Sequence, residues 1–129
     1  MELTNLDAKP KAAKRRTPYT ALTLKYLRAM GYTCVRTEHY DAHANVKHDY
    51  LGFIDYHALS DAETLGVQIC GKDYTSHIKK MTVKRAIAVK CWLACPGRTL
   101  ILIGWGKVKG KYEPRITNFW LTDGEIRHD

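Results

Sequence analysis

The spacing of apolar residues predicts a helix near the start of the chain and a short strand after it. Between Pro18 and Gly31, apolar side chains recur at helical intervals; proline suits a first helical turn, and glycine suits a helix end. Residues 32–37 have the composition of a short strand. Residues 38–48 are polar, and we expect a loop there.

Two apolar runs further along predict a β-hairpin. Residues 52–59 and 64–70 are rich in β-forming side chains, and they flank the polar residues 60–63, which suit a four-residue loop. This loop length sets the register, and it places Asp55 directly opposite Gln68 on one face of the sheet. Leu65, Val67 and Ile69 of the second run then point to the opposite face.

A second helical region follows this hairpin. We expect it to begin at Thr75 or Ser76, which can cap a helix, and to reach about Ala94, with an interruption near Thr82. Cysteines 91 and 95 lie four residues apart in its apolar end, where we expect them to be buried and inert.

The last part of the chain predicts further strands. Residues 99–103 form a continuous apolar run, which predicts a strand. Residues 105–108 lead into a turn over 109–111, and a final strand follows over 112–121. The resulting order, α-β-β-β-α-β-β, predicts an α/β domain of residues 17–129 with a mixed central sheet. Residues 1–16 are basic, lack apolar periodicity and are expected to form a flexible tail.

Charge is distributed unevenly along the 129 residues. The chain has 21 Lys and Arg against 13 Asp and Glu, a net charge of +8. Residues 71–118 hold eleven of the bases and only two acids, whereas residues 17–70 hold six acids and four bases. A basic half joined to an acidic half suits a polyanion bound by one and processed by the other.

Other features of the composition narrow the class of protein. No run of 18 apolar residues occurs, so we expect no membrane span, and four cysteines are too few for a secreted disulfide scaffold. The first residues lack the pattern of a secretion signal, so we expect a cytoplasmic location.

An acidic cluster near the hairpin is the main candidate for chemistry. Asp55 lies within an apolar run, and an ionised carboxylate there needs a cation or several hydrogen-bond donors. Asp49 and Glu38 could converge on the same place, and three carboxylates around the Gln68 amide oxygen suit Mg²⁺. The alternative is that Asp55 is hydrogen-bonded for structural reasons and the other two acids are solvated.

Three segments resemble known proteins when taken together. Residues 48–55 (HDYLGFID), 66–70 (GVQIC) and 104–117 (GWGKVKGKYEPRIT) resemble small, mostly uncharacterised phage and prophage proteins of the PD-(D/E)XK nuclease-like superfamily. The resemblance runs from about Thr17 to Leu121. It implies a restriction-endonuclease-like α-β-β-β-α-β core with an additional C-terminal hairpin strand.

The resemblance also implies roles for individual residues. Asp55 matches the first metal-binding aspartate of the superfamily. Gln68 stands where the motif has its second acid, and Cys70 stands where it has lysine, so the site is altered. Lys72, two residues further on, is then the candidate for orienting the attacking water. Glu38 and Asp49 would restore negative charge for Mg²⁺ or Mn²⁺.

The function implied is metal-dependent hydrolysis of DNA phosphodiester bonds, as in an endonuclease or a Holliday-junction resolvase. Basic residues of the second helical region and the last hairpin would hold the DNA backbone, selecting DNA structure rather than base sequence; these are Lys79, Lys80, Lys84, Arg85, Lys107, Lys109, Lys111 and Arg115. Related nucleases often dimerise, which leaves a homodimer open. The alternatives are a catalytically inactive nucleic-acid-binding module on the same fold, and a scaffold for an acidic protein.

Cysteine and histidine offer two weaker alternatives. Cys91 and Cys95 with His39 and His43 suggest a zinc site, but neither pair has the usual C-x₂-C spacing. Cys70 with His57 or His77 suggests a thiol nucleophile, but no third residue that would orient the base is evident.

Overall fold

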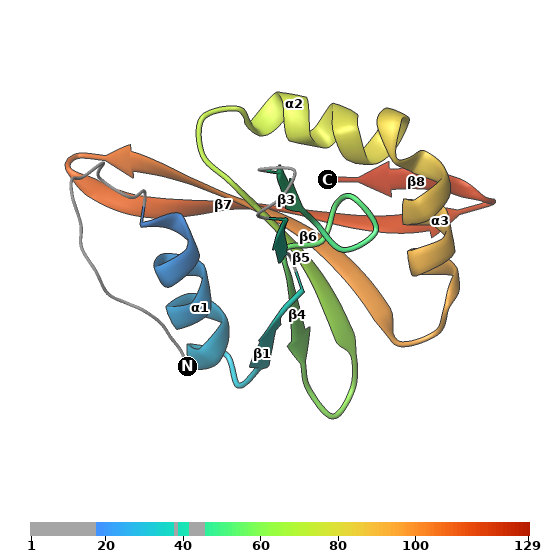
Figure 1. Cartoon of the computed structure of the whole chain (residues 1–129), viewed down its shortest axis with the longest axis horizontal. Helices are drawn as coiled ribbons and strands as arrows, with labels where there is room; N and C mark the ends of the chain where they lie inside the picture. The colour runs from blue at the N-terminus through green and yellow to red at the C-terminus, as the bar shows by residue number, and fades with distance from the viewer. Residues whose placement is uncertain (1–17, 38, 42–45) are drawn as a thin grey trace.

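The computed structural model describes residues 18–37, 39–41 and 46–129. Within these ranges the chain forms a six-stranded mixed sheet with helices on both faces (Figure 1). Its elements are α1 (Tyr19–Ala29), β1 (Thr33–Arg36), β2 (His39–Asp41), β3 (Val46–His48), β4 (Tyr56–Leu59), β5 (Thr64–Cys70), α2 (Tyr74–Lys79), the π-helix η2 (Lys80–Lys84), α3 (Ala86–Ala94), β6 (Arg98–Val108), β7 (Lys111–Thr122) and β8 (Glu125–His128). The predicted tail, residues 1–16, lies outside the described residues.

The strand order β1-β4-β5-β6-β7-β8 confirms the predicted α/β class with a mixed sheet. Only the β5–β6 pair within this sheet is parallel, because α2, η2 and α3 carry the chain from the end of β5 back to the start of β6. β2 and β3 pair with each other in a separate two-stranded ribbon. The expectation of a loop over residues 38–48 is therefore wrong: their polar composition hides two short paired strands.

Each face of the sheet has its own hydrophobic core. On one face, Leu27 of α1 packs with Val67 and Ile103 of the central strands. On the other face, Met81, Val89 and Trp92 of the second helical region pack against Leu100 and Leu102 of β6. Alternate residues of β5 and β6 thus serve opposite cores, as the period of a strand requires.

The predicted register of the β4–β5 hairpin is confirmed. Leu59 pairs with Thr64, and Tyr56 pairs with Val67. β4 begins at Tyr56 and not at residue 52, because Leu51 and Gly52 have φ values of 57° and 81° and form a turn in place of extended backbone.

The predicted interruption of the second helical region is also confirmed. Five residues around Thr82 form the π-helix η2, in which the Arg85 amide donates to the Lys80 carbonyl, five residues back, at 2.8 Å. The helix begins at Tyr74, one residue before the earlier of the two predicted caps, because Asp73 occupies the capping position. Cys91 and Cys95, which we expected to be buried, are exposed, since Trp92 and Val89 face the sheet in their place.

Strand β8 is an element that the periodicity did not indicate. It pairs with β7 across a turn in which Asp123 and Gly124 have φ values of 52° and 78°. Asp-Gly at such a turn is a strong hairpin signal, so the local sequence did indicate this hairpin.

No helix within residues 18–37, 39–41 and 46–129 has the length and apolar character needed to cross a bilayer.

A stability test follows from two glycines of β6. A Cβ on Gly104 would overlap the buried ring of Tyr74, whereas a Cβ on Gly106 would meet no atom within 4 Å. We expect Gly104→Ala to lower the free energy of unfolding by about 1–3 kcal/mol, because the core must move to admit the methyl group. We expect Gly106→Ala to change it by less than about 0.5 kcal/mol. Urea denaturation measures both, and equal effects would contradict the proposed packing.

Candidate active site

Asp55 is a buried carboxylate at the point where β1, β4 and β5 meet. Its side chain is only 5% exposed. The Asp55 amide donates to the Val67 carbonyl at 2.8 Å, and its carbonyl accepts from Thr37 at 3.0 Å, so the backbone is held between β5 and the end of β1. This placement directs the carboxylate to β5, where Oδ2 accepts from the Ile69 amide at 2.8 Å.

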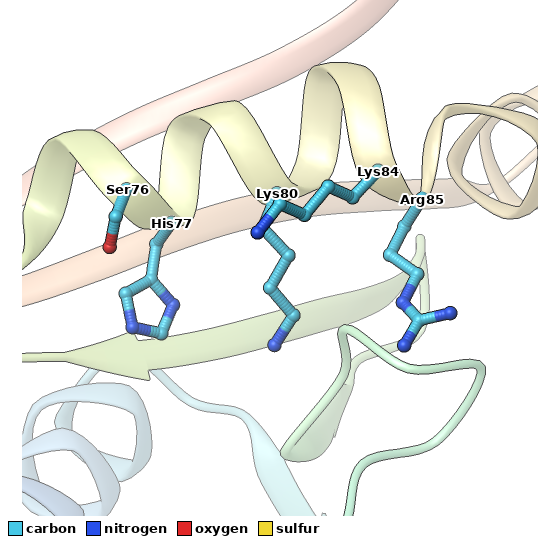
Figure 2. Close-up of a pocket in the computed structure, with 5 residues that line it drawn as sticks. All are labelled: Ser76, His77, Lys80, Lys84 and Arg85. Carbon is cyan, nitrogen blue, oxygen red and sulfur yellow. The ribbon is translucent and has the colours of Figure 1, made fainter.

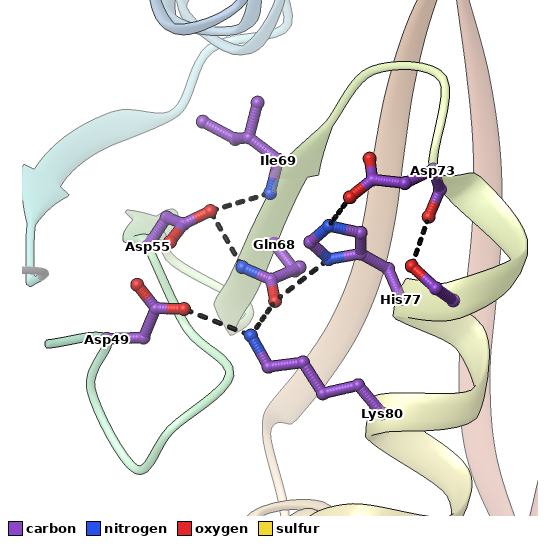
Figure 3. A network of polar contacts seen from close by, with 8 residues as sticks. Asp49, Asp55, Gln68, Ile69, Asp73, His77 and Lys80 are labelled. Carbon is purple, nitrogen blue, oxygen red and sulfur yellow. Dashed lines mark hydrogen bonds and ion pairs between the residues drawn. The ribbon is translucent and has the colours of Figure 1, made fainter. Parts of the chain in front are cut away.

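Gln68 is the second component, and it is even more deeply buried, at 1% exposure. Its Nε2 donates to Asp55 Oδ2 at 2.7 Å, which confirms that the two side chains meet as the hairpin register predicted. The amide oxygen, Oε1, faces the other way, toward the helix (Figure 3). Asp55 therefore meets the nitrogen of this amide and not its oxygen.

Lys80 brings a positive charge to the Gln68 amide. Its Nζ donates to Gln68 Oε1 at 2.9 Å and to Asp49 Oδ2 at 3.2 Å (Figure 3). The side chains of Lys80 and Asp49 are 26% and 14% exposed, so this ion pair is half-buried. Because an ammonium group only donates and a carboxylate only accepts, Lys80 and Asp55 together determine which end of the amide faces each of them.

His77 lies on the other side of the Gln68 oxygen. Its Nδ1 is 3.4 Å from Gln68 Oε1, and its Nε2 is 3.0 Å from Asp73 Oδ2. Asp73 occupies the N-cap position of α2 without a side-chain capping bond, and His77 stands one turn later on the same side of the helix. The polar network thus runs without interruption from Asp55 through Gln68 to the start of α2.

A basic depression of about 490 Å³ opens next to this network. Figure 2 shows His77, Lys80 and Arg85 projecting from the helix toward the sheet and the 49–55 segment. The Arg85 guanidinium packs on Gly52, where an added Cβ would lie 2.7 Å from Nε. The lining residues are Ser76, His77, Lys80, Lys84 and Arg85. We refer to this depression as the helix groove.

The remaining predicted basic residues are placed elsewhere. Lys72 is exposed in the turn after β5, and it lines a second depression with Lys107 and Arg115 of the β6–β7 hairpin. Arg115 lies over the Tyr74 ring at 4.2 Å, and Lys107 lies over the Tyr112 ring at 5.1 Å. Lys72 is thus grouped with the hairpin and not with Gln68, and Lys80 is the lysine that contacts the site.

Other predicted side chains of the hairpin and helix are exposed, namely Lys79, Lys109 and Lys111. Glu38, the remaining predicted metal ligand, lies outside the described residues. Cys70 is buried, and desolvation raises the pKa of its thiol to about 12, which does not suit a thiolate nucleophile. Sequence reasoning placed Lys80 among the DNA contacts and missed its link to Gln68, although the predicted interruption near Thr82 was a sign of unusual geometry in this helix.

Comparison with known proteins gives no relative to guide interpretation. No family model, curated protein or solved structure matches the chain. The chemistry of the site is therefore argued from its own contacts.

The Lys80 contacts can be tested through stability. We expect Lys80→Met to lower the free energy of unfolding by about 1–3 kcal/mol, because Asp49 and the buried Gln68 oxygen lose this donor. Lys79→Met removes the same charge from the exposed neighbouring position and serves as the matched control, with an expected change of less than about 0.5 kcal/mol. Chemical denaturation measures the free energy of unfolding of both variants. If the two curves coincide, the Lys80 contacts contribute nothing to the fold.

Proposed function

We propose that the protein is a metal-dependent nuclease of the PD-(D/E)XK type that hydrolyses DNA phosphodiester bonds at the helix groove. The observation that carries this proposal is a buried aspartate, Asp55, joined through Gln68 to Lys80, which lines a basic depression. The β4–β5 hairpin between α1 and the second helical region supports a restriction-endonuclease-like core.

The donor atoms in the site are of the type that Mg²⁺ takes. Asp49 Oδ2 and Gln68 Oε1 both converge on the Lys80 ammonium, so a positive charge is already held between two hard oxygen atoms. Asp49 and the Gln68 oxygen would hold Mg²⁺ or Mn²⁺, and Asp55 would join them once the Gln68 amide turns its oxygen toward it. The ion would supply a water of lowered pKa and neutralise charge on the phosphate. Lys80 would then leave the Gln68 oxygen, because ammonium and metal compete for the same lone pairs.

Lys80, once released, is the group best placed to act on the phosphate. It lines the helix groove together with Lys84 and Arg85. A guanidinium group binds two phosphate oxygens at once, and an ammonium group stabilises the charge that develops when the phosphate is attacked. These three cations would hold the scissile phosphate beside Asp55.

The second basic surface, formed by Lys72, Lys107 and Arg115, would hold more distant phosphates. Phosphate contacts carry no base code, so we expect recognition of DNA structure and not of base sequence. Two separated cationic surfaces suit a branched or bent duplex, because its backbone does not follow one straight line.

One observation favours a second function, that of a catalytically inactive DNA-binding module. The Gln68 amide presents an N–H and not an oxygen to Asp55, and its oxygen already accepts from Lys80. A network with all of these contacts satisfied can be purely structural. In that case the cationic surfaces would bind DNA without cleaving it.

Cleavage assays separate the two functions. We expect the wild-type chain to cut branched or nicked DNA in Mg²⁺ or Mn²⁺. We expect Asp55→Asn and Lys80→Ala each to slow cleavage by about 100-fold or more, because each removes charge from the reacting centre. Lys72→Ala, a change of the same kind on the other basic surface, is the control and should retain most of the cleavage rate at saturating DNA.

Two results would contradict the nuclease proposal. One is salt-sensitive binding by a wild-type protein that cuts none of these substrates in either metal, which supports the inactive module. The other is undiminished cleavage by Asp55→Asn.

DNA binding at the helix groove has its own test. We expect the double variant Lys84→Gln/Arg85→Gln to reduce the slope of log K against log salt by about 2, because each phosphate contact releases counterions. Lys25→Gln/Arg28→Gln removes the same charge from α1, on the opposite face of the sheet, and should leave the slope unchanged. Fluorescence anisotropy with a labelled duplex measures both slopes. Equal slopes for the two variants would exclude the helix groove as the binding surface.

A further inference from the structure

Three metal-binding side chains meet at the junction of β5 and α2, beside the proposed active site. They are Cys70 at the end of β5, Asp73 at the helix cap and His77 one turn into the helix. One donor atom from each, a thiol sulfur, a carboxylate oxygen and an imidazole nitrogen, lies within 4.8 Å of the other two. Nitrogen, sulfur and carboxylate oxygen are the donors that Zn²⁺ takes in proteins.

His77 is placed between two oxygen atoms of its neighbours. Its Nδ1 lies 3.4 Å from Gln68 Oε1, which also accepts from Lys80. Its Nε2 lies 3.0 Å from the Asp73 carboxylate. The ring nitrogen that faces away from Gln68 therefore already lies beside a second ligand that could bind the same ion.

We propose that Cys70, Asp73 and His77 form a binding site for a transition-metal ion of the Zn²⁺ type, distinct from the Mg²⁺ site at Asp55. Ligand atoms bound to one tetrahedral Zn²⁺ lie about 3.3–3.6 Å apart, given metal–ligand bonds of about 2.0–2.3 Å. Nε2 of His77 and Oδ2 of Asp73 are 3.0 Å apart, so only their distances to the Cys70 sulfur, each within 4.8 Å, must shorten, by about one ångström at most. The Asp73 side chain is 63% exposed and can move by this amount.

The surroundings suit a site with three protein ligands and one open position. Cys70 is 5% exposed and forms the inner wall, while Asp73 opens to solvent and leaves room for water as a fourth ligand. Gln68 accepts from the ring nitrogen that does not bind the metal, which is the usual support of a metal-binding histidine. Thiolate and imidazole select Zn²⁺ or Co²⁺ over Mg²⁺.

The test is a metal titration that needs neither DNA nor cleavage. The full chain, first stripped with a chelator, is titrated with Co²⁺. We expect one equivalent to produce visible d–d bands and a near-ultraviolet thiolate-to-cobalt band that Zn²⁺ abolishes and excess Mg²⁺ leaves unchanged. In Cys70→Ser the thiolate band disappears, and in His77→Gln the affinity falls by at least about 10–100-fold. Circular dichroism without metal checks that each variant is folded, and His77→Gln serves if Cys70→Ser is not.

Cys91 and Cys95 provide the matched control. They are exposed, four residues apart on and just after α3, and form a second place where two thiolates could bind cobalt. We expect Cys91→Ser/Cys95→Ser to keep the spectrum and affinity of the wild type. Loss of the spectrum in this variant, an unchanged spectrum in Cys70→Ser, or no cobalt binding by the wild type would each overturn the proposal and leave His77 and Asp73 as a contact without a metal.

Discussion

The charge on Asp55 is the constraint on which the arrangement of the site depends. A carboxylate that is 5% exposed costs several kcal/mol unless donors surround it, and β5 supplies two, the Ile69 amide and the Gln68 side chain. Satisfying Asp55 orients the Gln68 amide, and the oriented amide then presents an acceptor to Lys80 and His77. One buried carboxylate therefore determines which groups donate and which accept in the network that extends from Asp55 to α2.

The π-helix η2 determines which basic residue reaches this network. The Arg85 amide bonds five residues back, to Lys80, so the helix is locally wider and the side chains on either side of it change direction. Lys80 begins this segment, and Arg85 follows its end. Both project toward the sheet, as Figure 2 shows, and Lys80 is partly buried there, whereas Lys79 immediately before it is exposed. π-Helical turns are frequent at functional sites, and here Lys80 at its start contacts Gln68 while Arg85 after its end packs on Gly52.

Sequence reasoning succeeded where local rules decide the geometry. The four-residue loop over 60–63 determined the hairpin register, and the register alone brought Asp55 to Gln68. It failed for Lys80, because the direction of a side chain in a π-helix depends on hydrogen bonding that residue spacing does not encode. For Lys72, proximity to Gln68 in sequence suggested a shared site, whereas the structure places Lys72 in a depression with residues of the β6–β7 hairpin.

Gln68 is the residue through which the two proposed metal sites would influence each other. A carboxylate in its place would accept at both ends, and it would repel Asp55 in place of donating to it. Glutamine instead donates to Asp55 and accepts from Lys80 and His77, so its two ends have opposite roles. If His77 bound an ion through Nε2, Nδ1 would remain as the donor that holds the Gln68 oxygen toward the helix. If the Gln68 oxygen bound an ion, it would lose its contact with Lys80. Gln68 thus couples Asp55 to the start of α2.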